Sequence, residues 1–137
     1  MKIVAVSDLH ADGGWRDFSF CKITTDDPSI VGWSEYMEGS VCPSGLSAIV
    51  RSMGDSLVGE DPRAVERLSQ RLRGTTNQVV GGLANMAIAA IENALIDIKA
   101  KALGIPASEL FGGTRAPSAP SAPSSAAPPC PALRQSD

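Results

Sequence analysis

The sequence predicts one α+β domain in which a three-stranded antiparallel meander is followed by a helical bundle. Apolar residues recur at strand-like spacing up to Tyr36 and at helical spacing from Pro43 onward. The connections between the expected strands are short, which favours antiparallel pairing. The chain has 137 residues. That length excludes an eightfold β/α barrel, which needs about 250 residues.

The first part of the chain contains the three expected strands. Residues 2–10 begin with aliphatic side chains and end in polar ones. Residues 18–24 alternate apolar and polar side chains, which is typical of a strand with one buried face. Residues 30–36 supply the third strand. Turn-forming sequences at 11–14 and 25–29 separate the strands.

Two helices are expected after Pro43. The first has Ser44 as its N-cap. Its buried face comprises Leu46, Ile49, Val50, Met53 and Leu57. The second begins with Asp61 as its N-cap and Pro62 at its first position. Its apolar face comprises Val65, Leu68 and Leu72, and its arginines are expected to face water.

A third helix, about residues 83–103, shows the clearest periodicity. Gly104 and Pro106 end it. Its broad apolar stripe consists of Ala84, Ala87, Ile88, Ile91, Ala94, Leu95, Ile98 and Ala102. Two acids, Glu92 and Asp97, interrupt this helix. Structural pairing with Lys99 or Lys101 is favoured over a catalytic role, because buried acids in helices are usually paired.

The composition changes sharply near Gly113. Residues 114–137 contain six of the ten prolines, mixed with alanine and serine. Such a segment lacks the apolar content to pack and many of the donors for regular structure. We therefore expect a domain at residues 1–113 and a disordered tail at residues 114–137.

Composition also restricts the function classes. The net charge of −3 leaves no strongly basic surface for nucleic acid. No apolar run approaches the roughly 18 residues of a membrane span, and the N-terminal run is too short for a signal peptide. The odd number of widely spaced cysteines is typical of free thiols in a reducing cytoplasm.

Two short motifs suggest chemistry but lack the residues to complete it. Asp8 and His10, after an aliphatic strand, resemble the first ligands of calcineurin-like metallophosphoesterases, which need further histidines. Residues 54–57 spell the Gly-Asp-Ser-Leu tetrapeptide of a hydrolase family whose serine requires a histidine base. The chain has one histidine, and it lies upstream of the tetrapeptide.

A longer pattern spans residues 85–113, NMAIAAIENALIDIKAKALGIPASELFGG. It resembles the segment that closes the N-terminal domain of the mandelate racemase/muconate lactonising enzyme group of the enolase superfamily. The matching positions include Glu92, Asp97 and Lys101, followed by Gly104, Pro106 and the Gly112-Gly113 pair. Residues 57–62 also resemble that group's link between its first two helices. The resemblance covers about residues 1–113 and implies an enolase N-terminal domain-like fold.

The resemblance implies a domain that caps a catalytic barrel. In such enzymes the barrel removes the proton next to a carboxylate, and a barrel-bound Mg ion stabilises the enediolate. None of those catalytic or metal-binding residues can be assigned within this chain. Two capping loops help set specificity, and by position these are residues 11–17 and 39–45. Trp15 and Arg16 in the first suit a hydroxylated acid, although Arg16 could equally serve only to solvate a turn.

Where a barrel should follow Gly113, the sequence has the Pro/Ala/Ser-rich tail. The sequence therefore predicts a truncated, inactive cap of an acid-sugar dehydratase or racemase, arising from a frameshift or premature stop. Without its barrel partner the cap should expose apolar surface and self-associate or be marginally stable. The alternative is a stand-alone protein-interaction module. A third, weaker hypothesis is a metallophosphoesterase-like fragment.

Overall fold

Three antiparallel strands in sequence order form one sheet. They are β1 (Ile3–Asp12), β2 (Asp17–Thr25) and β3 (Val31–Tyr36), with β2 in the centre. This computed structural model describes residues 1–37, 43–76 and 81–113. A register shift between Ile3 and Ala5 shows a bulge at the start of β1. The predicted meander is therefore confirmed.

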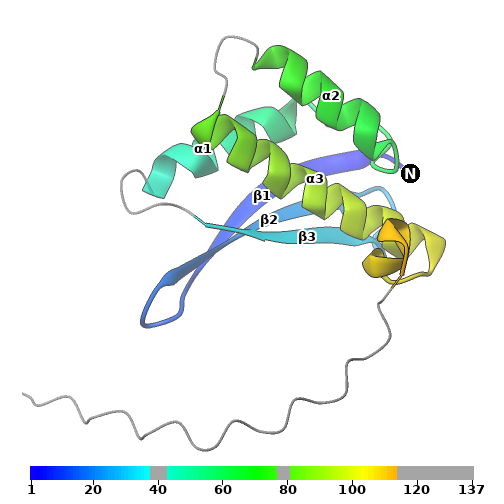
Figure 1. The fold of residues 1–137 in the computed structure, drawn as a ribbon, viewed down its shortest axis with the longest axis horizontal. Coiled ribbons are helices and arrows are strands. Elements are labelled where there is room, and N and C mark those ends of the chain that lie inside the picture. The colour runs from blue at the N-terminus through cyan, green and yellow to red at the C-terminus, as the bar shows by residue number, and fades with distance from the viewer. Residues whose placement is uncertain (38–42, 77–80, 114–137) are drawn as a thin grey trace, which may run out of the picture.

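All of the helices lie on one face of the sheet (Figure 1). They are α1 (Pro43–Asp55), α2 (Val65–Thr75) and α3 (Gly82–Leu103), and the short 3-10 helix η1 (Ala107–Phe111) follows them. The longest helix, α3, packs on β3 and β2, while α1 packs between β1 and α3. The remaining helix, α2, packs on α3.

Aliphatic side chains make up almost the whole core. Alternate residues of β2 face the helices, and the facing sides of α1, α2 and α3 meet them. Tyr36 is the aromatic member of this core. The largest fully buried side chains are Ile3, Ile23, Leu46, Leu57, Leu68, Leu72, Ile88, Ile91, Leu95 and Ile98.

Two glycines allow helices to approach the sheet closely. A Cβ added at Gly32 in β3 would collide with the carbonyl of Ala94 and the side chain of Ile98 in α3. A Cβ added at Gly54 near the end of α1 would collide with Val6 in β1. The Gly-Asp-Ser-Leu sequence therefore lies at the end of α1, where its glycine allows the helix to pack closely on β1.

Side chains and loops cover part of both sheet edges. At β3, the Trp33 backbone N–H donates to Asp97 Oδ2 at 2.9 Å, and Lys101 Nζ donates to the Val31 carbonyl at 2.7 Å. Lys101 and Asp97 also pair with each other at 2.6 Å. At β1, the Ile3 backbone bonds with the 59–60 turn. These contacts block strand addition at one end of each edge.

The helix boundaries differ from the expected ones at three points. α1 begins at Pro43, so Ser44 lies inside its first turn and is not the N-cap. α2 begins at Val65 and not at Asp61. Asp61 instead accepts the Arg63 backbone N–H at 3.0 Å and pairs with its guanidinium, because a short acid followed by proline favours a turn. Leu57 is buried beyond the end of α1.

Two further expectations have different outcomes. Ala102 was expected in the apolar stripe but is exposed, because the last turn of α3 extends past the first residue of β3. The expected tail, residues 114–137, lies outside the described residues, so the division of the chain at Gly113 stays a prediction.

Within the described part of the chain, no helix is both long and apolar enough to cross a membrane.

The close packing at Gly32 yields a test of the fold. We expect Gly32→Ala to lower the free energy of unfolding by about 2 kcal/mol or more, because backbone and side-chain atoms of α3 must move. Gly74→Ala is the matched control, since it lies in α2 with open space around it. It should stabilise the chain by roughly 0.5–1 kcal/mol. Urea titration followed by circular dichroism measures both. Equal effects would contradict this packing.

Candidate functional site

The tip of the β1–β2 hairpin contains the first expected capping loop. β1 and β2 are both longer than the sequence predicts, and Asp12 pairs with Asp17. The loop that joins the two strands is therefore only residues 13–16. Asp12 Oδ1 accepts the Gly14 backbone N–H at 2.7 Å, and the Arg16 carbonyl accepts the Gly13 N–H at 2.9 Å. Gly14 has a φ of 80°, which favours glycine. The hairpin extends away from the helices (Figure 1).

Arg16 is held between two aromatic rings and a carboxylate. Its guanidinium carbon lies 4.9 Å from the Trp15 ring centroid and 4.2 Å from that of Phe18. Its Nη2 donates to Glu35 Oε1 of β3 at 2.8 Å. Trp15 packs edge-on against Phe18 and is 78% exposed. The tip therefore exposes the Trp15 indole, and the Arg16 guanidinium is held in place next to it.

This arrangement suits binding more than chemistry. Arg16 Nε is buried and has no hydrogen-bond partner among the described residues, so the exposed side of the guanidinium is its Nη2 end, which Glu35 holds. A ligand carboxylate would compete with Glu35 for the same cation. The role of Trp15 and Arg16 in specificity stays a prediction. The second expected loop, residues 39–45, lies mostly outside the described residues.

A polar cluster joins the hairpin to α1. His10 Nε2 lies 2.9 Å from Asp8 Oδ2, and His10 Nδ1 lies 3.0 Å from Ser19 Oγ. Ser47 Oγ of α1 lies 3.2 Å from His10 Nε2 and 3.0 Å from the Tyr36 hydroxyl. Alternation along β1 places Asp8 and His10 on the same face, which the sequence could indicate. The partners from other elements are visible only in the fold.

The electrostatics of the cluster favour an ionised Asp8. Partial burial would raise the pKa of Asp8, but hydrogen bonds from His10 and Ser47 and the charge of Arg51 outweigh it. The pKa therefore lies below its usual value. Arg51 Nε lies 3.2 Å from Asp8 Oδ1. The ionised Asp8 carboxylate thus bonds to the neighbouring polar side chains and holds them in position.

The described residues do not complete the other chemical motifs. They contain no cluster of three or more His, Cys, Asp or Glu side chains that could hold a metal ion. They therefore do not fit a magnesium site. Ser56 Oγ donates to the Met53 carbonyl at 2.6 Å, as a helix-end hydroxyl does. Burial, followed by the charge of Asp8, raises the pKa of Cys21 to about 12, so this thiol is not a nucleophile at neutral pH.

The two acids of α3 take structural partners. Asp97 pairs with Lys101, one of the two lysines the sequence suggested. Glu92 Oε2 instead lies 3.3 Å from Arg73 Nη2 of α2. The sequence gave no signal for this pair, because its members come from helices that meet only in the fold. Structural pairing is therefore the observed state of both acids.

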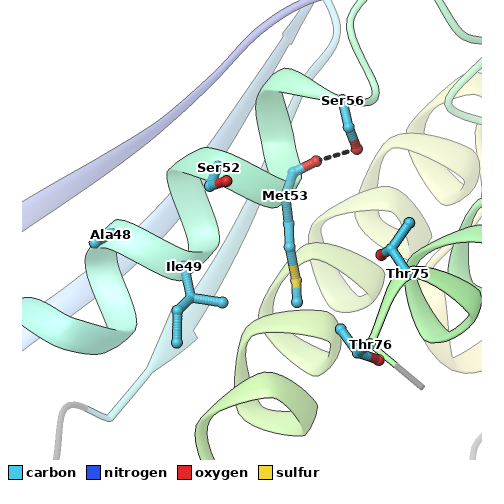
Figure 2. A pocket seen from close by; sticks show the side chains of 7 residues that line it. All are labelled: Ala48, Ile49, Ser52, Met53, Ser56, Thr75 and Thr76. Carbon is cyan, nitrogen blue, oxygen red and sulfur yellow. Dashed lines mark hydrogen bonds between the residues drawn. The ribbon is translucent and has the colours of Figure 1, made fainter. Parts of the chain in front are cut away.

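A pocket of about 480 Å³ lies between α1 and the C-terminal end of α2 (Figure 2). Hydroxyl-bearing and apolar side chains line it: Ala48, Ile49, Ser52, Met53, Ser56, Thr75 and Thr76. Three of its hydroxyls donate to carbonyls of their own helix ends, Ser56 to Met53, Thr75 to Leu72 and Thr76 to Arg73. This lining has no titratable group and therefore no acid or base for catalysis.

The comparisons with known proteins agree with this fold. The family model described as mandelate racemase / muconate lactonizing enzyme, N-terminal domain, matches residues 14–112. This match spans most of the chain.

The chain belongs to this family.

Curated family members are much longer than this chain. D-galactonate dehydratase of Xanthomonas axonopodis pv. citri (strain 306) is 39% identical over 114 residues, which cover 82% of this chain and 28% of the relative. The chain thus spans less than a third of the curated relatives it matches.

Solved family structures show the same fold. A protein of Burkholderia xenovorans strain LB400, provisionally named L-alanine-DL-glutamate epimerase, has a TM-score of 0.79 and 43% identity. The match covers 85% of this chain and 29% of that one. A second structure of that protein is bound to magnesium and fumarate. The 3,6-anhydro-D-galactonate cycloisomerase of Zobellia galactanivorans has a TM-score of 0.74 at 28% identity, covering 82% of this chain and 32% of that one.

The lowered pKa of Asp8 predicts an acid-sensitive contribution to stability. A carboxyl group whose pKa is lowered in the folded state stabilises the fold at pH values above its unfolded-state pKa, about 3.9. This stabilisation is lost as the pH falls through the folded-state pKa. We expect Asp8→Asn to cost about 1–2 kcal/mol at pH 7 and less at pH 3. Urea titrations at the two pH values measure the difference. A penalty that is independent of pH would contradict the ionised state of Asp8.

Proposed function

We propose that residues 1–113 form the substrate-capping domain of a Mg-dependent acid-sugar enzyme, a dehydratase or racemase. The observation that carries the proposal is the 39% identity over 114 residues to a D-galactonate dehydratase, together with the family match at residues 14–112. The magnesium- and fumarate-bound relative supports a metal and a carboxylate ligand for the whole enzyme. The partners of this domain are then a catalytic barrel and a sugar acid.

In this proposal the chain contributes binding and no catalytic residue. Its histidine and many of its described acids are engaged in structural contacts, as the Asp8–His10 and Asp97–Lys101 pairs illustrate. The hairpin tip supplies an exposed indole from Trp15 and the fixed charge of Arg16. An indole excludes water from a sugar ring, and a guanidinium binds a carboxylate. The enzyme's Mg would stabilise the enediolate formed from the substrate.

The first prediction from this proposal concerns the chain alone. We expect the purified chain to show no dehydration of D-galactonate with Mg present, because the described residues hold no cluster of side chains that could bind a metal ion. The 2-keto product can be measured with semicarbazide. The Xanthomonas axonopodis enzyme is the positive control. Turnover by the chain alone would overturn the assignment of catalysis to a domain other than residues 1–113.

The second prediction concerns Trp15 and Arg16. Residues 1–113 replace the matching segment of the Xanthomonas axonopodis D-galactonate dehydratase, and steady-state kinetics are measured. We expect Trp15→Ala and Arg16→Ala to raise KM about tenfold or more in this chimera, since each removes a contact worth roughly 1.4 kcal/mol. Met86→Ala, on the outer surface of α3, is the control and should leave KM unchanged. Unchanged KM in both hairpin variants would refute the loop assignment.

A second candidate function is a stand-alone interaction module. The favouring observation is the uncovered apolar face of the sheet, on which Trp33 is 42% exposed and Met37 is 63% exposed. Activity of the chimera would favour the enzyme cap, and a stable complex without activity would favour the module. In either case we propose a cytoplasmic location, where Cys21 stays reduced.

A further inference from the structure

The pocket between α1 and α2 lies where the C-terminal ends of both helices meet. α1 ends at Asp55 and α2 ends at Thr75, and the lining residues Met53, Ser56 and Thr76 lie within two residues of those ends. Figure 2 shows Met53 and Ser56 on the side of α1 that faces the end of α2. The carbonyl end of a helix carries a partial negative charge, so two such ends at one pocket favour a positively charged ligand.

Within the described residues, neither helix end has a free cation that would offset this partial charge. The last turn of α1 contains no basic residue, and its final residue is the acidic Asp55. The last turn of α2 contains Arg73, but this guanidinium pairs with Glu92 of α3 at 3.3 Å. The lining itself has no charged side chain. The partial charge at the pocket is therefore available to a bound cation.

Three hydroxyl groups of the lining can only accept a hydrogen bond from a ligand. Ser56, Thr75 and Thr76 each donate to the carbonyl three residues earlier in the chain, at 2.6, 2.7 and 3.0 Å. A hydroxyl has one proton, so after that donation only its lone pairs remain for a ligand. A primary ammonium group has three N–H donors and no acceptor, which matches this set of oxygens.

The rest of the lining is mostly apolar and comes from α1. Ala48 and Ile49 lie about 10–12 Å along the helix from Ser56, and Met53 lies between them. An alkyl chain placed along these residues would leave water. The volume of about 480 Å³ lies within the range of small-molecule sites. Ser52, Ser56 and Thr75 are exposed, so a ligand can enter from solvent.

We propose that this pocket binds a small primary alkylammonium ion. Its ammonium group lies at Ser56, Thr75 and Thr76, and its alkyl chain lies along Ile49 and Met53. A carboxylate is disfavoured because the helix ends repel it, and a neutral alcohol gains no attraction from them. The dissociation constant should lie in the millimolar range, because the exposed lining removes only part of the ligand from water. The inference does not depend on the proposed enzyme function.

Titration of the full chain with n-butylammonium chloride, followed by amide NMR spectra, tests the site. We expect the largest shift changes at Ser52, Met53, Ser56, Thr75 and Thr76. n-Butanol has the same chain without the charge, and tetramethylammonium has the charge without N–H donors. Each should bind at least tenfold more weakly. The ionic strength is held constant with sodium chloride, because salt screens the attraction to the helix ends.

Two arginine variants locate the binding. Ser52→Arg places a cation at the pocket and should raise the dissociation constant of n-butylammonium at least tenfold. Ser44→Arg is the matched control, because it makes the same charge change at an exposed position in the first turn of α1, outside the lining. This control should bind like the original chain. Circular dichroism confirms that each variant is folded.

A second pair of variants keeps the test valid if Ser52→Arg does not fold. Thr75→Val removes one acceptor at nearly constant volume and should raise the dissociation constant at least threefold. Thr75→Ser keeps the hydroxyl and should bind like the original chain.

Three results would overturn the proposal. The first is the absence of shift changes at the lining residues up to about 100 mM n-butylammonium, well above the expected dissociation constant. The second is equal affinity for n-butanol, because the pocket would then bind only the alkyl chain. The third is equal binding by Ser52→Arg and Ser44→Arg, or by Thr75→Val and Thr75→Ser, because the ammonium group would then lie elsewhere.

Discussion

The packing of α3 against β3 is the contact on which the rest of the structure depends. Gly32 lets the helix backbone at Ala94 approach the strand, and Ile98 fills the space beside it. Asp97 and Lys101 then bond to the backbone of the same strand. Hydrophobic burial fixes the distance between helix and sheet, and the two charged groups fix the position along the strand. The other helices pack around this pair, since α1 and α2 both contact α3.

Because of that packing, the helices cover only one face of the sheet. A three-stranded sheet can be covered by helices on one face while its other face meets solvent or a partner. The aliphatic core lies under the helices, whereas both tryptophans and the two phenylalanines of β2 lie on the opposite face or at the hairpin tip. The sheet therefore separates the residues that stabilise the domain from those available for recognition. Trp15 and Trp33 belong to the second group, and Ile23 belongs to the first.

The polar side chains near the hairpin bond mainly to one another. Asp8, His10 and Ser47 connect the hairpin to α1, and this mutual bonding uses the groups that a general acid or base would need. The chain spans less than a third of its curated relatives. In the proposed enzyme, this chain would contribute the shape and charge of a surface, and the β1–β2 hairpin would carry it.

The sequence by itself determined the element order, the family and most of the core, because these depend on local periodicity and on a pattern confined to residues 85–113. It also indicated the Asp97–Lys101 pair, whose members are one helical turn apart. Only the tertiary structure decided that Asp97 caps the edge of β3, that Arg16 is held by Glu35, and that Glu92 pairs with Arg73. These contacts join residues far apart in sequence, and no local pattern encodes which distant side chains meet. The start of α2 was missed for a related reason, since Asp61 and Pro62 are equally compatible with a helix cap and with the turn that the neighbouring Arg63 stabilises.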